Sequence, residues 1–133
     1  MGYDTYFDGS FALNKPLDNK TREVIASLSD EKCKLYNIPG DLCIWFYDEK
    51  TNSITADGGK CCYYIEWIYF IVKNILEPKG YVLKGCVEYK GDEDEDRGLV
   101  KIKRNEIRLF KAVIKYEEYT DEFKKRRINK AYW

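Results

Sequence analysis

A long apolar stretch near the middle of the chain, residues 61–76, constrains the fold more than any other part of the sequence. A Gly-Gly pair at 58–59 precedes it. Pro78 and Gly80 follow it and mark its end, because proline disfavours helical geometry in the residue before it. Within the stretch, apolar residues recur at the spacing of one helix face: Tyr64, Trp67, Ile68, Ile71 and Ile75. The sequence therefore predicts a buried helix over 61–76.

The apolar arc of this helix is wider than one sheet face needs, because a second stripe runs beside the first: Cys61, Ile65, Tyr69, Val72 and Leu76. We therefore expect the helix to be covered from two sides or to meet a partner. The stretch is too short for a membrane span and Glu66 interrupts it, so a membrane is not an expected partner.

Segments in which apolar and polar residues alternate predict β-strands on both sides of this helix. The strands are expected at residues 3–13, 42–47, 54–56, 81–90, 99–103 and 106–114. A first helix, capped by Asp18, is expected over 19–29. Arg104-Asn105 predicts a hairpin turn between the last two strands, since Asn readily adopts the left-handed conformation. Gly85 predicts a bend or a close neighbour in its strand.

The resulting order, β-α-β-β-α-β-β with the final hairpin over 99–114 written as one β unit, predicts an α+β fold in which an antiparallel sheet carries two helices on one face. A basic, helix-compatible tail follows over 120–133. With 133 residues, the chain is expected to form a single domain over 1–133. Its core should span about 3–115, and a C-terminal extension should cover 116–133.

The charges of the chain balance overall but are divided unevenly along it. Residues 1–96 contain 11 Lys and Arg against 18 Asp and Glu, whereas residues 97–133 contain 12 against 5. The two parts therefore carry formal net charges of −7 and +7. This asymmetry hints at a surface with an acidic and a basic side.

The cysteines and the absence of histidine argue against a metal site and against catalysis. The five cysteines include no C-x-x-C pair, and the chain has no His, which excludes the usual mixed zinc sites. Buried free thiols in a reducing cytoplasm are expected. Neither Cys43 nor Cys62 has a His to activate it as a nucleophile. We therefore expect a non-enzymatic protein with no cofactor and no metal.

An acidic loop at 92–96 could hold Ca²⁺, but it lacks the Gly and Glu positions of an EF-hand, which favours a solvated turn. Two other segments are candidate binding sites. The first is a possible anion site at Gly58, Gly59 and Lys60, where the start of a helix could bind an anion. The second is a partner-binding site in the tail: Lys124, Lys125, Arg126, Arg127, Tyr132 and Trp133.

The chain resembles a family of short, mostly uncharacterised proteins carried by phages and prophages. The resemblance covers about residues 3–110 and rests on an ordered set of motifs: Tyr3-Asp4-Thr5, Phe7-x-Gly9-x-Phe11, Asn14-Lys15-Pro16-Leu17, Pro39-Gly40-x-x-Cys43-x-Trp45, Gly58-Gly59-Lys60, Tyr64-x-Glu66-Trp67, Gly80-Tyr81-x-Leu83-x-Gly85-x-Val87 and Asp96-x-Gly98. The resemblance implies a small accessory protein of a mobile element and names no reaction. The chain departs from the family by its extension past about residue 112.

Three hypotheses for function follow. The favoured one is a cytoplasmic, non-enzymatic accessory protein that binds and modulates a host protein, as an anti-CRISPR-like inhibitor of host defence does. The second is a nucleic-acid-binding protein that uses the basic tail together with Lys101, Lys103, Arg104, Arg108 and Lys111. The third is a binder of a small nucleotide at 58–60.

Overall fold

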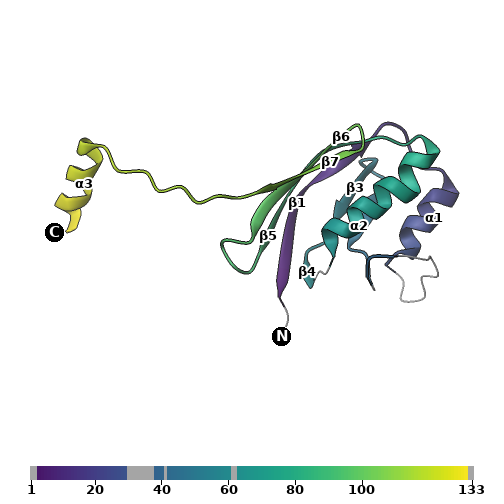
Figure 1. The fold of residues 1–133 in the computed structure, drawn as a ribbon, viewed down its shortest axis with the longest axis horizontal. Coiled ribbons are helices and arrows are strands. Elements are labelled where there is room, and N and C mark those ends of the chain that lie inside the picture. The colour runs from purple at the N-terminus through teal and green to yellow at the C-terminus, as the bar shows by residue number, and fades with distance from the viewer. Residues whose placement is uncertain (1–2, 30–37, 41, 61–62, 132–133) are drawn as a thin grey trace.

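The computed structural model describes residues 3–29, 38–40, 42–60 and 63–131, and these residues form an α+β protein built on an antiparallel sheet. Within the described residues, six strands follow one another in the order β2-β3-β1-β5-β6-β7, and a short seventh strand, β4, pairs with β1. The helices α1 and α2 lie on one face of this sheet (Figure 1). The α+β class and the antiparallel sheet are thus confirmed.

The strands have the following bounds: β1 Asp4–Leu13, β2 Trp45–Asp48, β3 Ser53–Ala56, β4 Gly59–Lys60, β5 Leu83–Gly91, β6 Arg97–Lys103 and β7 Glu106–Lys111. The helical elements are α1 Asn19–Ser27, α2 Tyr64–Phe70, the π-helical η1 Ile71–Leu76, the 3-10 turn η2 Glu77–Lys79 and α3 Asp121–Ala131. The structure therefore adds the short strand β4, which the alternation of residues does not reveal.

The central helical segment differs from expectation in its start and in its winding. α2 begins at Tyr64, after Tyr63 in a left-handed conformation with φ 59°, whereas the sequence predicted a start at 61. From Ile71 the α-helix changes to a π-helix, in which an amide bonds to the carbonyl five residues earlier. The amide of Glu77 accordingly donates to the carbonyl of Val72. The face predicted to be buried is confirmed, since Trp67, Ile68, Ile71 and Ile75 all belong to the core. Both apolar stripes contribute, because Val72 and Leu76 are also buried.

The first helix and the last hairpin follow from local chemistry. The Asp18 side chain accepts a hydrogen bond from the Thr21 amide at 2.7 Å, as expected of an N-cap, and α1 ends at Ser27 rather than at 29. Arg104 and Asn105 form the predicted two-residue turn, with φ 51° and 65°.

The strand expected over 42–47 is shifted and covers Trp45–Asp48.

Two asparagines flank the start of β5 and replace missing strand partners. Asn14 accepts from the Val82 amide at 2.9 Å and donates to the Gly80 carbonyl at 3.4 Å. On the other side, Asn105 accepts from the Leu83 amide at 2.7 Å and donates to the Tyr81 carbonyl at 2.8 Å. Each side chain thus presents a donor and an acceptor to the backbone, as a neighbouring strand would.

β7 ends at Lys111, although the apolar pattern predicted a strand up to 114. The reason is the length of its neighbour: the last pair is Gly98–Lys111, and β6 begins only one residue earlier, at Arg97. After Ala112 donates to the Arg97 carbonyl at 2.8 Å, no strand among the described residues remains to pair with the chain.

The hydrophobic core lies between the sheet and the helices, and β7 contributes only the half-buried Ile107 to it. It comprises Phe11, Leu13, Leu17, Ile25, Leu28, Cys43, Trp45, Ile54, Trp67, Ile68, Ile71, Val72, Ile75, Leu76, Tyr81, Leu83, Val87, Val100 and Ile102. Among the side chains described beyond Asn105, which extend to Arg126, none is buried. The C-terminal segment therefore adds little to the core.

Candidate functional site

The chain leaves the sheet after β7 as an extended arm. We use the name C-terminal arm for residues 112–131, which include α3. The arm carries α3 away from the sheet and its covering helices (Figure 1). Its large apolar side chains are exposed: Val113 by 82%, Ile114 by 58%, Tyr116 by 92%, Tyr119 by 49% and Phe123 by 44%. Such a run of apolar side chains in water is typical of a surface that becomes covered by a partner.

The start of α3 is organised by contacts within the arm itself. The Thr120 hydroxyl lies 3.4 Å from the amide of Phe123, which donates to it, and the Thr120 carbonyl accepts from Lys124 at 2.9 Å. The rings of Tyr119 and Phe123 stack with their centroids 5.0 Å apart. The arm thus presents a locally ordered aromatic pair next to its helix.

The cations predicted to bind a partner are partly neutralised by neighbours. The Lys124 ammonium lies 2.7 Å from the Glu118 carboxylate, and the Arg126 guanidinium lies 3.2 Å from Glu122. Lys125 is exposed. Arg127 lies in α3, but its side chain is outside the described part, as are Tyr132 and Trp133. Solvent-exposed ion pairs are weak, so a partner could replace them at little cost.

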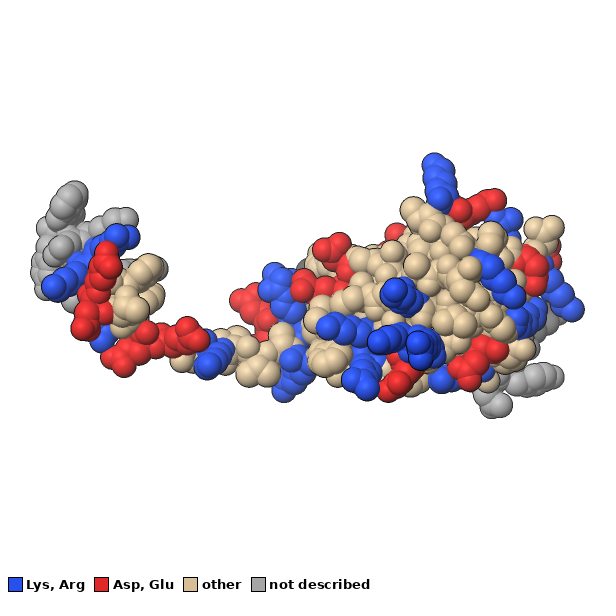
Figure 2. Space-filling model, turned by 90° about the horizontal axis from the view of Figure 1, so that it is seen from above, with Lys and Arg blue, Asp and Glu red and all other residues tan. Residues whose placement is uncertain are grey.

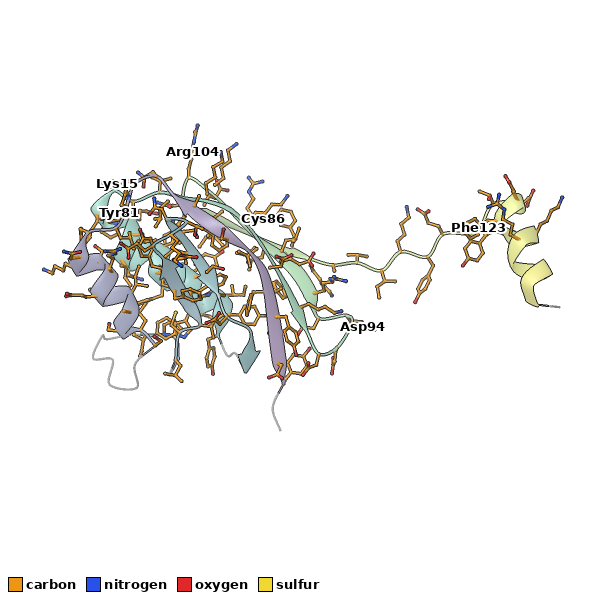
Figure 3. The ribbon with its side chains drawn as sticks, turned by 180° about the vertical axis from the view of Figure 1, so that it is seen from behind. Lys15, Tyr81, Cys86, Asp94, Arg104 and Phe123 are labelled. Carbon is orange, nitrogen blue, oxygen red and sulfur yellow. The ribbon has the colours of Figure 1, made fainter. Side chains whose placement is uncertain are left out.

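A second surface is the face of the sheet that the helices leave uncovered, which we name the open face. In Figure 3, Arg104 lies at one end of the β6–β7 hairpin and Asp94 at the opposite end of the sheet. Figure 2 shows basic side chains over much of the molecule seen from above. Basic residues gather at the Arg104 end: Lys84, Lys101, Lys103, Arg104 and Arg108. Charges of both signs lie toward the Asp94 end, where Asp8 pairs with Glu88 and Lys90 pairs with Arg97, and where the Arg97 guanidinium lies 3.4 Å from the Glu88 carboxylate.

The basic end of the open face contains a shallow groove of about 310 Å³. It is lined by side chains of β6 and β7: Lys101, Lys103, Glu106, Arg108 and Phe110. The Lys101 ammonium lies 5.1 Å from the centre of the Phe110 ring, and the Arg108 guanidinium lies 3.3 Å from the Glu106 carboxylate. We name these five residues the β6–β7 groove.

The strand register explains which of the expected residues meet in this groove. Lys101 and Lys103 share the open face, as their alternate positions predicted. Lys111 does not join them, because it pairs with Gly98 and lies on the opposite face from Arg108 and Phe110. The sequence reasoning missed Phe110, although its two-residue spacing from Arg108 was a usable signal.

The possible anion site at Gly58, Gly59 and Lys60 does not lie at the start of a helix. Gly59 and Lys60 form β4 and pair with Thr5 and Asp4, and α2 begins only at Tyr64. The expected link between this segment and a helix N-terminus is therefore wrong. The binding of an anion or a nucleotide at 58–60 stays a prediction.

The acidic loop at 92–96 serves to close the end of the sheet. The Asp92 carboxylate accepts from the Asp4 amide at 2.8 Å, and the Asp96 carboxylate accepts from the Tyr3 hydroxyl at 2.7 Å. Within the described part of the chain, no three Asp, Glu or Cys side chains converge as metal ligands do. Two carboxylates of this loop, those of Asp92 and Asp96, thus have structural partners at the start of β1 and in the residue before it.

The cysteines that the structure describes are in different environments. Cys43 is buried and donates to the Trp45 carbonyl at 3.5 Å, as expected of a buried thiol. The same expectation is wrong for Cys86, which is exposed because its position on β5 faces the open side of the sheet. Cys33, Cys61 and Cys62 lie outside the described residues.

Comparison with protein-family models, with curated proteins and with solved structures finds no match. Within the described residues, the structure contains no helix of the length and apolarity that crossing a membrane requires.

Proposed function

We propose that this chain is a non-enzymatic accessory protein of a phage or prophage that binds and modulates a host protein through its C-terminal arm. It would act in the host cytoplasm, in the manner of an anti-CRISPR-like inhibitor of a defence system. The resemblance of residues 3–110 to phage-borne proteins supports the origin. The exposed apolar side chains of the arm support the binding, and this second observation carries the proposal.

The exposure of these side chains has no benefit for the isolated chain. Tyr116 and Val113 are 92% and 82% exposed, and burying such side chains against a partner is worth roughly 1.5–3 kcal/mol each. The cost of ordering side chains and of association must be subtracted from this gain. A few aromatic and Arg anchors commonly dominate the energy of protein interfaces, and the arm combines Tyr116, Tyr119 and Phe123 with Arg126.

The position of β7 offers a route for the first contact. β7 is the last strand in the sheet order, so one side of its backbone has no strand partner within the described residues. An extended segment of a partner can add to such an edge through main-chain hydrogen bonds. The arm continues directly from this strand, so the edge and the arm could hold a single partner together.

The test is affinity purification from the bacterial host of the element, with the full chain as bait. A Tyr116→Ser, Phe123→Ser double variant removes two apolar anchors from the arm. The matched control is Tyr6→Ser, because Tyr6 is also an exposed aromatic, at 56%, but lies on the open face. We expect a stoichiometric host protein with the wild type and with the control, and its loss with the double variant. Recovery of no such protein, or equal recovery with all three, overturns the proposal.

A further inference from the structure

The basic end of the open face contains an arrangement of charges that folding alone does not favour. Lys101 and Arg108 occupy directly opposite positions on β6 and β7. Like charges at such positions destabilise a sheet. Lys103 is on the same face of β6, and Lys84 approaches from β5, one residue before the Gly85–Ile102 pair. Arg104 sits in the adjoining turn. Glu106 is the acidic residue that lines the groove among them.

An aromatic ring lies among these cations. Phe110 is 42% exposed although it is a large apolar residue on a strand. Its ring centre is 5.1 Å from the Lys101 ammonium, and both residues line the same hollow of about 310 Å³. The volume of this hollow is at the lower end of the range for ligand sites, and the hollow is open to solvent. It therefore suits one unit of a bound polymer better than a small molecule that must be enclosed.

Cations beside an exposed ring are the arrangement that recognises single-stranded nucleic acid. Lys and Arg neutralise phosphates, and a base that is free of its stack can lie on the ring. A duplex keeps its bases stacked inside, so it would use the cations and leave the ring unused. We propose that the β6–β7 groove binds single-stranded nucleic acid, with phosphates at Lys101, Lys103 and Arg108 and a base on Phe110.

The opposite end of the open face limits the length of this site. Asp8 and Glu88 lie opposite each other on β1 and β5, and the acidic loop at 92–96 follows. Lys90 and Arg97 share this end of the face, and Arg97 contacts Glu88 at 3.4 Å, so the charges there are mixed. Phosphates are therefore favoured at the Arg104 end in Figure 3, where the groove has three cations and one acidic residue, Glu106. The footprint is a few nucleotides. This site is separate from the arm, so it goes beyond the proposed binding of a host protein and does not depend on it.

The binding test is fluorescence anisotropy of the full chain with labelled oligonucleotides of about twelve nucleotides, a length within the usual site sizes. The probes are an oligo-dT, an oligo-rU and a duplex of the same length, and the first two decide between DNA and RNA. We expect at least one of the two single-stranded oligonucleotides to bind more tightly than the duplex. If about three phosphates are neutralised, log K should fall against log salt with a slope of about −2.

Variants of the groove have matched controls elsewhere in the chain. Lys101→Gln with Arg108→Gln removes two cations and should lower the salt slope by about 1.4 in magnitude. Lys20→Gln with Lys50→Gln removes the same charge from exposed positions on α1 and in the turn after β2, and should leave binding unchanged. Phe110→Leu should weaken binding about 5- to 150-fold, which is the effect expected when one stacked base is lost. The salt slope should stay the same, because this variant removes no charge. Phe46→Leu is its control, because Phe46 is 38% exposed on β2, at the other edge of the sheet.

Several outcomes overturn the proposal. These are no anisotropy change at low salt, equal binding of the duplex, or an equal loss of binding with the groove variant and with its charge control. A doubled mass in light scattering without oligonucleotide binding would also contradict it and would show that two copies of the chain associate. Should a groove variant fail to fold, photo-crosslinking of the wild type to a thio-uridine oligonucleotide decides. Crosslinks should map to 99–111, and crosslinks confined to 120–131 contradict the proposal.

Discussion

The side-chain oxygen of Asn105 accepts a hydrogen bond from the backbone amide of Leu83 at 2.7 Å, which ties the β6–β7 turn to the first residue of β5. The amide nitrogen of the same side chain donates to the Tyr81 carbonyl at 2.8 Å. Asn105 is also buried and has a φ of 65°. One residue thus combines the conformation that the turn requires with two hydrogen bonds that extend the sheet beyond its paired strands.

Replacing Asn105 by Gly should keep the turn and remove both bonds. The amide of Leu83 and the carbonyl of Tyr81 would then lose their side-chain partner. Each buried polar group that is left without a hydrogen bond lowers the free energy of unfolding by about 1–3 kcal/mol. We expect the free energy of unfolding to fall by about 2 kcal/mol or more in chemical denaturation. Arg104→Gly is the control: it has a similar φ of 51° but is exposed, and it should change stability by less than about 0.5 kcal/mol. Equal effects at the two positions would contradict a role for the hydrogen bonds.

Ile71→Ala should destabilise the protein by about 2–5 kcal/mol, from lost burial and the cavity that remains. Ile71 is completely buried in η1. Ile114→Ala removes the same atoms from the arm, where the side chain is 58% exposed, and should cost less than about 0.5 kcal/mol. Urea denaturation of both variants measures the difference. A change under about 0.5 kcal/mol for Ile71→Ala would show that this helix face is not essential to the core.

The buried face of the central helix was predictable because its apolar residues recur at helical spacing, which depends on neighbours in sequence alone. The turn at Arg104 and Asn105 was predictable for the same reason. The end of β7 was not, because the length of β6 decides it and Val113 and Ile114 continue the apolar pattern of a strand. Local pattern also failed at Gly59 and Lys60, whose strand conformation depends on pairing with residues about 55 positions earlier.

The candidate sites were predictable to a smaller degree. Consecutive cations in the tail are visible in the sequence, but their pairing with Glu118 and Glu122 depends on how the arm folds. Lys101 and Lys103 were expected to share a face, yet the groove also requires Arg108 and Phe110 from the next strand. The register across the hairpin brings these together, and a turn of a different length would have placed them on the other face.

Gly85→Ala should be strongly destabilising, because two effects combine at this position. Gly85 has a φ of 154°, and an added Cβ would clash with the Ser10 carbonyl oxygen on β1. Gly59→Ala is the matched control: its φ of 128° is also unfavourable for Ala, but no atom of the described residues lies within 4 Å of the added carbon. We expect Gly59→Ala to cost about 1–3 kcal/mol from backbone strain. Gly85→Ala should exceed it by at least about 1 kcal/mol in thermal or urea unfolding, since overpacking adds about that much. Equal costs would exclude the close approach of β1 as the reason for glycine.

Asp18 should make stability depend on pH in the acidic range. A hydrogen bond from the Thr21 amide lowers the pKa of this carboxyl, and the hydroxyls of Thr21 and Tyr81 and the charge of Lys79 lower it further. Because the pKa is lower in the folded state, the stabilisation is complete above the unfolded pKa of about 4 and is lost as pH falls through the folded pKa. Asp18→Asn should therefore be less stable than the wild type at pH about 6, and the two should converge near pH about 2. A difference that does not change with pH would contradict this assignment.

Deleting residues 120–133 should leave the fold intact and abolish the binding of the host protein. The described side chains of this segment are all outside the core, and Phe123 stacks on Tyr119 of the arm rather than on the sheet. The free energy of unfolding should therefore change by less than about 0.5 kcal/mol. Chemical denaturation followed by circular dichroism measures this, and the affinity purification described above measures binding. The competing interpretation is a tail that closes the end of the sheet through Phe123 and Trp133. In that case the truncated protein would aggregate or unfold at lower denaturant, and the arm would be part of the fold instead of a binding element.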